Sequence, residues 1–66
     1  MENSIRVERA KKKITQAELA ERVNVSRQTI HAIETGKFVP STVLALKIAS
    51  FFKVNFEEIF TLENTD

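Results

Sequence analysis

The chain has 66 residues, 42% of them hydrophobic, with no Cys, one His and a formal net charge of +1 at pH 7. A chain of this length can form one hydrophobic core but not two. The sequence has no run of roughly 18 to 20 consecutive apolar residues, as a membrane span requires. Without Cys it can form neither a disulfide nor a cysteine metal site. We therefore expect a single cytoplasmic domain over residues 1–66, with no metal, no cofactor and no membrane partner.

The first half of the sequence predicts two helices and no convincing strand. The first helix is expected to begin at residue 3 or 4 and to end at Lys12, with an inward stripe made of Val7, Ala10 and Ile14, and with Ile5 near it. Thr15 and Glu18 form a capping box that opens a second helix. Its expected inward face consists of Ala17, Leu19, Ala20 and Val23. Asn24 then reverses the chain, because Asn tolerates the left-handed backbone conformation.

Three further helices follow in the second half. Ser26 is predicted to cap a third helix over residues 27–35, and Gly36 ends it. Pro40 excludes helix before it, and Ser41 opens a fourth helix, whose apolar residues run to Phe52. Asn55 caps a short last helix over residues 56–60, and the tail LENTD is expected to be frayed.

The second and third helices, joined by the tight turn at Asn24, form a predicted helix-turn-helix over residues 16–35. This motif lays its second helix in the major groove of DNA. Arg27 and Gln28 open that helix, and they match the base edges of guanine and adenine, respectively. Residues 1–39 carry a net charge of +3 and residues 40–66 one of −2, so one face suits an anionic partner. The predicted partner is double-stranded DNA.

From about Ile5 to Phe60 the chain resembles the small stand-alone members of the Xre-type helix-turn-helix regulators, which are related to the lambdoid phage repressor and Cro proteins. The resemblance is carried by SRQTIHAIETGK at 26–37, PSTVLALKIA at 40–49 and EEIF at 57–60. It implies an all-α, five-helix repressor-like DNA-binding domain. It also implies a sequence-specific transcriptional regulator, most simply a repressor that acts as a homodimer on a dyad operator.

The motif and the resemblance together predict two sets of DNA contacts. Base contacts are predicted for Arg27, Gln28, His31 and Ala32. Phosphate contacts are predicted for Gln16, Thr29, Thr35 and Lys37. Gln16 stands at the first turn of its helix, where free N–H groups favour an anion, and the resemblance implies that it also buttresses Arg27. For each of the polar residues, an ordinary solvated surface position is the alternative.

The resemblance further implies that Arg9 pairs with Glu34 and so fixes the third helix against the first. Two positions depart from the family pattern. Lys13 occupies a turn position where many relatives have Gly, which predicts a small backbone cost. Glu8 stands where relatives often carry an apolar residue, and Val7 is expected to take over that packing.

The chain contains five Phe but no Trp or Tyr, more aromatic area than one small core readily hides. We therefore predict a homodimer contact within the C-terminal segment 51–66 that involves Phe51 or Phe60 together with Leu62. The alternative is that all five Phe belong to the core.

Two other functions remain open at this point. The chain could be the antitoxin of a toxin–antitoxin pair, although the short LENTD tail argues against a toxin-binding segment. It could also be a protein-interaction adaptor with the same fold, which should show an apolar patch on the third helix. An enzyme is not expected, because one His, no Cys and no Gly-rich phosphate loop leave little catalytic chemistry. No small-molecule effector is expected either.

Overall fold

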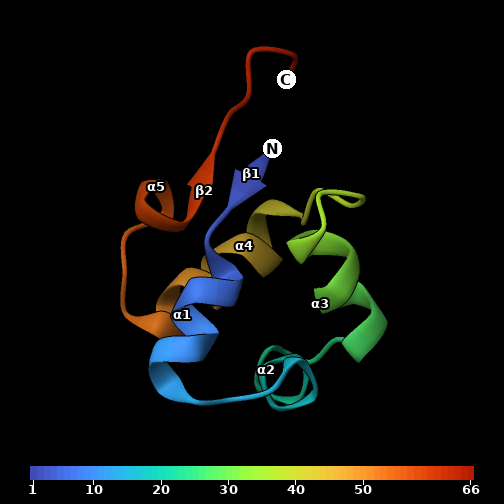
Figure 1. The fold of residues 1–66 in the computed structure, drawn as a ribbon, viewed down its shortest axis with the longest axis vertical. Helices are drawn as coiled ribbons and strands as arrows, with labels where there is room; N and C mark the ends of the chain where they lie inside the picture. Colours follow the sequence, from blue (N-terminus) through green and yellow to red (C-terminus); the bar gives the residue numbers. More distant parts are fainter.

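The computed structural model describes all of residues 1–66 and arranges five helices around one core (Figure 1). The elements in chain order are β1 (Glu2–Asn3), α1 (Ile5–Lys12), α2 (Gln16–Val23), α3 (Arg27–Glu34), α4 (Thr42–Phe52), α5 (Phe56–Ile59) and β2 (Phe60–Thr61). The all-α class and the five predicted helices are confirmed, with bounds that differ from the predicted ones by a residue or two. None of the helices is long and apolar enough to cross a membrane.

Four helices begin at the predicted capping residue: α2 at Thr15, α3 at Ser26, α4 at Ser41 and α5 at Asn55. The Thr15 hydroxyl accepts a hydrogen bond from the Glu18 N–H at 3.0 Å, and the Glu18 carboxylate accepts one from the Thr15 N–H at 2.9 Å. Ser26 and Ser41 cap α3 and α4 through their hydroxyls, each of which accepts from the N–H three residues on at 3.1 Å. Each cap satisfies one N–H that a helix start leaves free, and typically contributes about 1 kcal/mol.

The helix ends use the left-handed backbone conformation. Lys13, Asn24 and Lys53 follow α1, α2 and α4 with φ angles of 57°, 64° and 57°, and Gly36 follows α3 with a φ of 78°. For a residue with a Cβ this conformation costs roughly 1 to 2 kcal/mol. The backbone cost expected at Lys13 is therefore present, and a second one exists at Lys53, where the sequence analysis predicted nothing.

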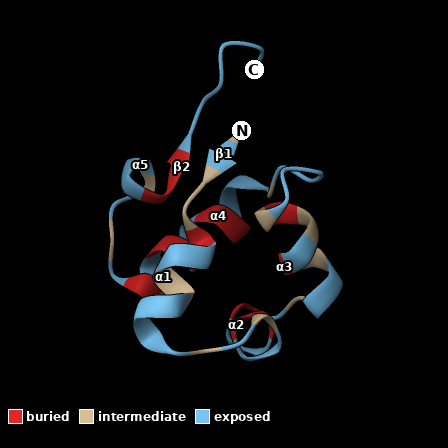
Figure 2. Cartoon of the chain, viewed as in Figure 1, coloured by how far each residue is buried: buried red, intermediate tan, exposed pale blue.

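The core consists of 13 buried residues, all of them hydrophobic, and every helix contributes to it (Figure 2). Its largest fully buried side chains are Ile5, Leu19, Ile30, Ile33, Ile48 and Ile59. Burying each of these contributes about 1.5 to 3 kcal/mol relative to leaving it in water. No charged or polar residue falls in the buried class, so the core itself holds the helices together by packing alone.

The predicted inward face of α1 is wrong at two positions. Val7 is 54% exposed and Ala10 is exposed as well. The helix is instead rotated so that Ile5 enters the core and Arg9, one turn later, points at α3. Val7 lies two residues from each of them, on the other side of the helix. It does not replace Glu8, whose half-buried carboxylate pairs with Lys11 at 3.2 Å.

Ala17 of α2 is also exposed, in contrast to the prediction. In α4 the predicted apolar residues divide between two sides. Leu44, Ile48 and Phe52 lie in the core, whereas Val43 and Leu46 are 64% and 52% exposed. A helix that is apolar almost all round gives no sequence signal for which of its sides faces inward.

A two-stranded antiparallel sheet that the sequence analysis did not predict joins the two ends of the chain (Figure 1). In its register Glu2 lies opposite Thr61 and Asn3 opposite Phe60. Strands of two residues are too short to leave an alternating hydrophobic pattern, so they could not be recognised from the sequence. Asn3 also donates its side-chain amide to the carbonyl of Ile33 at 2.8 Å, which ties β1 to the last turn of α3.

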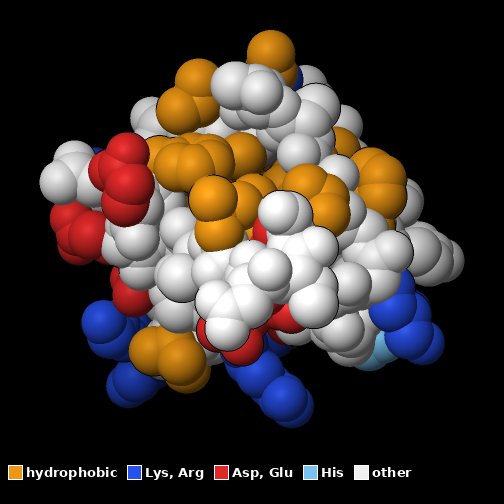
Figure 3. Space-filling model, turned by 90° about the horizontal axis from the view of Figure 1, so that it is seen from above, with side chains coloured by type: hydrophobic (Ala, Val, Ile, Leu, Met, Phe, Trp, Pro, Cys, Tyr) orange, Lys and Arg blue, Asp and Glu red, His pale blue; other side chains and the backbone are white.

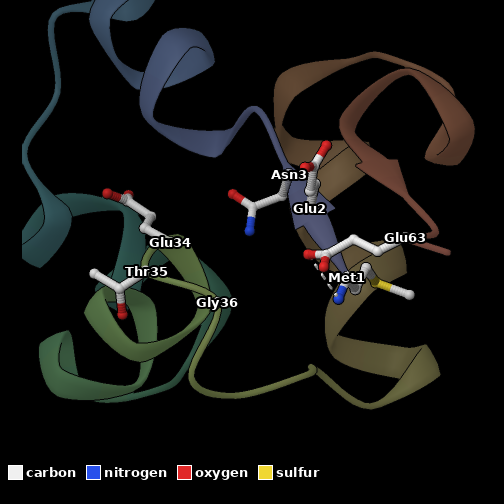
Figure 4. A pocket seen from close by; sticks show the side chains of 7 residues that line it. All are labelled: Met1, Glu2, Asn3, Glu34, Thr35, Gly36 and Glu63. Carbon is white, nitrogen blue, oxygen red and sulfur yellow. Dashed lines mark ion pairs between the residues drawn. The ribbon is translucent and has the colours of Figure 1, made fainter. Parts of the chain in front are cut away.

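The tail LENTD folds back over the start of the chain and is not simply frayed. The amino group of Met1 lies 2.9 Å from an Asp66 carboxylate oxygen and 3.4 Å from one of Glu63. Figure 4 shows Met1 and Glu63 facing each other beside β1. These contacts are exposed ion pairs, which typically contribute little to stability.

The five Phe divide between core and surface. Phe52 and Phe60 are buried, Phe51 and Phe56 are half-buried, and Phe38 is 48% exposed. This corrects the predicted dimer role of Phe60. Because β2 turns its side chain into the core of the same protomer, only 4% of Phe60 remains exposed for a partner.

Candidate nucleic-acid interface

The outer face of α3 presents the residues that were predicted to contact bases. Ile30 and Ile33 hold the inner face of α3 in the core, and Ala20 and Val23 of α2 lie in the same cluster. Arg27, Gln28 and His31 are exposed on the other side, and Ala32 is half-buried. The α2–α3 turn passes through Asn24 in the left-handed conformation, as predicted. The structure thus places the polar face of α3 outward and its apolar face in the core.

Gln16, the first residue of α2, connects three side chains of α3. Its amide oxygen accepts a hydrogen bond from Nη1 of Arg27 at 3.3 Å, and its amide nitrogen donates to Oε1 of Glu34 at 3.1 Å. The same nitrogen lies 3.3 Å from Nδ1 of His31. Because an amide nitrogen can only donate, this contact is a hydrogen bond in the His31 tautomer that accepts at Nδ1 and carries its proton on Nε2. Gln16 therefore orients two of the predicted base contacts.

Arg9 and Glu34 form the pair that was predicted between α1 and α3. Nε and Nη2 of Arg9 donate to the two carboxylate oxygens of Glu34 at 2.6 and 3.0 Å. The remaining Nη1 donates to the carbonyl of Ile14 at 3.0 Å. Only 15% of the Arg9 side chain and 5% of the Glu34 side chain are exposed, so solvent screens this pair weakly.

The ionisation of both partners follows from this geometry. Burial alone raises the pKa of the Glu34 carboxyl group, but hydrogen bonds from Arg9 and Gln16 and the positive charges of Arg9 and Arg6 outweigh it. The pKa of Glu34 therefore lies below its usual value. The hydrogen bond to Glu34 raises the pKa of Arg9 in turn, against the opposing effect of burial. Both groups are charged at neutral pH.

The residues predicted to contact phosphate differ in whether their side chains already have a partner within the protein. Lys37 is exposed and makes no ion pair. The hydroxyl of Thr35 donates to the carbonyl of His31 at 2.9 Å, and the hydroxyl of Thr29 lies 2.9 Å from that of Ser26. A phosphate can only accept a hydrogen bond from a hydroxyl, so Thr35 would have to rotate away from its helix to contact one.

One charged residue at this face was missed by the sequence analysis. Arg6 lines an open concavity of about 390 Å³ between α1 and α3, together with Arg9, Arg27 and His31. Gln16, Glu34 and Thr35 complete its wall, which contains no hydrophobic residue. The spacing of Arg6 and Arg9, three residues apart, places them on neighbouring parts of one helix surface and was the available signal.

A second concavity, of about 280 Å³, lies on the other side of the end of α3 (Figure 4). Its lining residues include Glu2, Glu34 and Glu63 but no Lys or Arg. Figure 4 shows the Glu34 carboxylate turned away from Met1 and Glu63. The acidic wall of this second concavity disfavours phosphate, so only the first concavity suits an anion.

Basic and acidic side chains also concentrate on different sides of the molecule. Figure 3 shows Lys and Arg side chains and the single His along the lower and right-hand rim, and carboxylates mainly at the left, with some in the lower middle. The acidic side includes α5, which carries Glu57 and Glu58 in its first turn. A polyanion would be attracted to the rim formed by α1 and α3 and repelled by α5.

The two short helices α2 and α3, with a polar and exposed outer face on α3, define a helix-turn-helix domain. The helix-turn-helix family matches residues 5–59 of the chain. An uncharacterised HTH-type transcriptional regulator of Methanocaldococcus jannaschii is 50% identical over all of both chains. The HTH-type transcriptional regulator YgzD of Bacillus subtilis is 46% identical over 63 residues, 96% of each chain. Another such regulator, of Archaeoglobus fulgidus, is 46% identical over all of this chain and 93% of its own.

The chain therefore belongs to the Xre-type helix-turn-helix family, a family of DNA-binding transcriptional regulators that generally act without catalysis.

Proposed function

We propose that this protein is a cytoplasmic repressor, a single domain that acts as a homodimer on an operator with dyad symmetry. One observation carries the DNA-binding part of this proposal. Arg27, Gln28 and His31 lie on the exposed face of α3, and Gln16 fixes Arg27 and His31 from the neighbouring helix. Side chains that are oriented before binding lose less conformational entropy when they meet a base.

The roles of the base contacts follow from their hydrogen-bonding groups. Arg27 uses Nη1 for Gln16 and keeps its other N–H groups for O6 and N7 of a guanine. Gln28 is exposed and free to pair with N6 and N7 of an adenine. His31 offers its Nε2 proton to a base acceptor or a phosphate. Ala32 has a short side chain, which lets the backbone of α3 approach the groove floor.

Phosphate contacts supply the larger part of the affinity. We assign them to Gln16, which stands in the first turn of α2, where a helix start leaves N–H groups free, and to Lys37, which follows α3. Thr29 and Thr35 contribute after rotation of their hydroxyls. A repressor needs only to occupy a DNA site that the polymerase must use, so these contacts suffice for the regulatory role.

The homodimer part is supported by the exposed apolar side chain of Leu62, 73% of which is accessible, and by the half-buried Phe51. Two copies joined through residues 51–62 would hold two α3 helices on one side, one DNA turn apart. An adaptor role finds no support, because the outer face of α3 is polar and not apolar.

The DNA-binding proposal is tested by selecting an operator from random duplexes and measuring its dissociation constant. Arg27→Ala and Gln28→Ala should each cost about 1 to 3 kcal/mol of specific binding and relax the base preference at one position. Lys47→Ala, at an exposed position of α4, is the matched control and should leave the preference unchanged. If the two α3 variants bind the selected operator as tightly as the wild type, the base-reading assignment is wrong.

A further inference from the structure

The concavity between α1 and α3 has features that base reading does not explain. Its wall holds three guanidinium groups, those of Arg6, Arg9 and Arg27, against the single carboxylate of Glu34. The wall has no hydrophobic residue, which excludes an apolar ligand. A site with this composition fits an oxyanion.

The charges in this concavity are not all compensated. Both oxygens of Glu34 are occupied by Arg9, and one of them also by Gln16. Arg9 and Glu34 thus neutralise each other, whereas Arg27 meets only the neutral amide of Gln16. Arg6 forms no ion pair and no side-chain hydrogen bond. The concavity therefore retains two positive charges, and its exposed cation on α1 is Arg6.

The position of the concavity indicates which oxyanion it receives. It is bordered by Arg27 and His31, which lie on the base-reading face, and by Gln16 at the start of α2. A DNA strand that passes along the edge of the groove containing α3 would run across this opening. Guanidinium groups bind phosphate through two parallel hydrogen bonds, a geometry that suits a backbone phosphodiester.

We propose that this concavity receives a phosphodiester of the bound DNA strand and that Arg6 is its principal contact. The proposal rests on the DNA-binding function proposed above and extends the protein–DNA contact from α2 and α3 to α1. Because a phosphodiester has the same charge next to any base, Arg6 adds affinity and positions the domain without reading sequence.

The test compares Arg6→Gln, Arg6→Lys and the control Lys47→Gln on the selected operator and on a random duplex, over a range of salt concentrations. The substitution removes one phosphate contact from each protomer of the proposed homodimer, so it lowers the magnitude of the slope of log K against log salt by about 1.8. Arg6→Gln should show this change on both duplexes, with a loss of affinity of roughly 3- to 10-fold at physiological salt and an unchanged base preference. Arg6→Lys keeps the positive charge and should keep the wild-type salt slope, and Lys47→Gln should also match the wild type.

Two results would overturn the assignment. In the first, Arg6→Gln leaves the salt slope unchanged while Arg27→Ala still impairs specific binding. The DNA-binding proposal would then stand, but Arg6 would not be a phosphate contact. The other is a saturable shift of the Arg6, Gln16 and His31 NMR signals with inorganic phosphate, lost in Arg6→Gln, without any effect of that variant on DNA. That outcome would assign the concavity to a free phosphate compound. A wild-type protein that selects no duplex at all would instead refute the proposed function.

Discussion

Arg9 and Glu34 join the first and third helices through two hydrogen bonds of 2.6 and 3.0 Å, and the carboxylate that completes this fork also accepts from Gln16. Glu34 is the last residue of α3, so the pair fixes the end of the helix whose beginning carries Arg27. The orientation of α3, and with it of the proposed base-reading face, therefore depends on a contact between α1 and the end of α3.

A double-mutant cycle on Arg9 and Glu34 should reveal strong coupling. Removing either partner leaves the other charge poorly compensated and half-buried, which should cost about 1 to 3 kcal/mol of unfolding free energy. The double variant Arg9→Ala/Glu34→Ala should cost less than the two single variants added together. Urea unfolding of the four proteins gives the coupling energy directly. A value below about 0.3 kcal/mol would show that solvent screens the pair as it does on an open surface.

The contribution of this pair should disappear in acid. Because the pKa of Glu34 is lower in the folded protein than in the unfolded chain, its stabilisation is fully present above the pKa of the unfolded chain. It is lost as the pH falls through the lowered folded value. Glu34→Gln mimics the protonated side chain, so its unfolding free energy should lie below that of the wild type at pH 7 and converge with it in strong acid. Parallel curves down to about pH 2 would contradict this reading.

The local elements of the fold could be predicted because their causes lie within a few residues. Thr15 and Glu18, and the serines at the starts of α3 and α4, satisfy N–H groups of the helices they open. The helix-turn-helix and the exposed start of α3 could be recognised for the same reason. The β1–β2 pairing could not, because it joins residues that are almost sixty positions apart and leaves no periodic pattern.

The errors concern orientations that only tertiary packing decides. The rotation of α1 depends on Ile5 and Arg9 together, so a hydrophobic stripe through Val7 was the wrong guide. Phe60 is buried because it belongs to β2, a strand that the sequence does not indicate. Arg6 becomes a candidate contact only once α1 and α3 are seen to enclose a shared concavity. Residue type alone shows none of these relationships.

Glycine at Lys13 should stabilise the protein. At a φ of 57° the side chain imposes a cost of roughly 1 to 2 kcal/mol, part of which is offset by the greater freedom of glycine in the unfolded chain. We expect Lys13→Gly to raise the unfolding free energy by about 0.5 to 1 kcal/mol. The control Lys11→Gly, inside α1, should lower it by about 1 kcal/mol. Thermal or urea unfolding measures both changes in unfolding free energy. If both substitutions lowered it by a similar amount, the side chain of Lys13 would impose no backbone cost.

The link from Gln16 to Arg27 should appear as coupling in DNA binding. Gln16→Ala removes the acceptor that holds Nη1 of Arg27, so the combined variant with Arg27→Ala should lose less affinity than the two single losses predict. Gln28 makes no contact with Gln16 and supplies the control, because its combination with Gln16→Ala should be close to additive. Equal coupling in the two cycles would mean that Gln16 acts on the whole interface and not by positioning Arg27.

Replacing an exposed apolar residue at the proposed dimer contact should weaken self-association. Leu62→Asp should raise the dimer dissociation constant at least 10-fold, which corresponds to about 1.4 kcal/mol, because it places a charge where two apolar surfaces meet. Val7→Asp is the matched control, since Val7 is also exposed and apolar but lies on α1. Sedimentation at micromolar concentration measures both. Equal effects of the two substitutions would locate the contact elsewhere.

The operator itself should show the symmetry of the dimer. One recognition helix reads about four to five base pairs, too few to identify a site in a genome, so two half-sites are needed. Their centres should lie about 10 base pairs, or roughly 34 Å, apart, because both α3 helices must enter the groove on one side of the duplex. Binding to half-site and full-site duplexes of the selected sequence measures the gain from symmetry. A strict monomer that binds both equally well would refute the dimer, and a dimer that buries its own α3 helices would refute DNA binding as well.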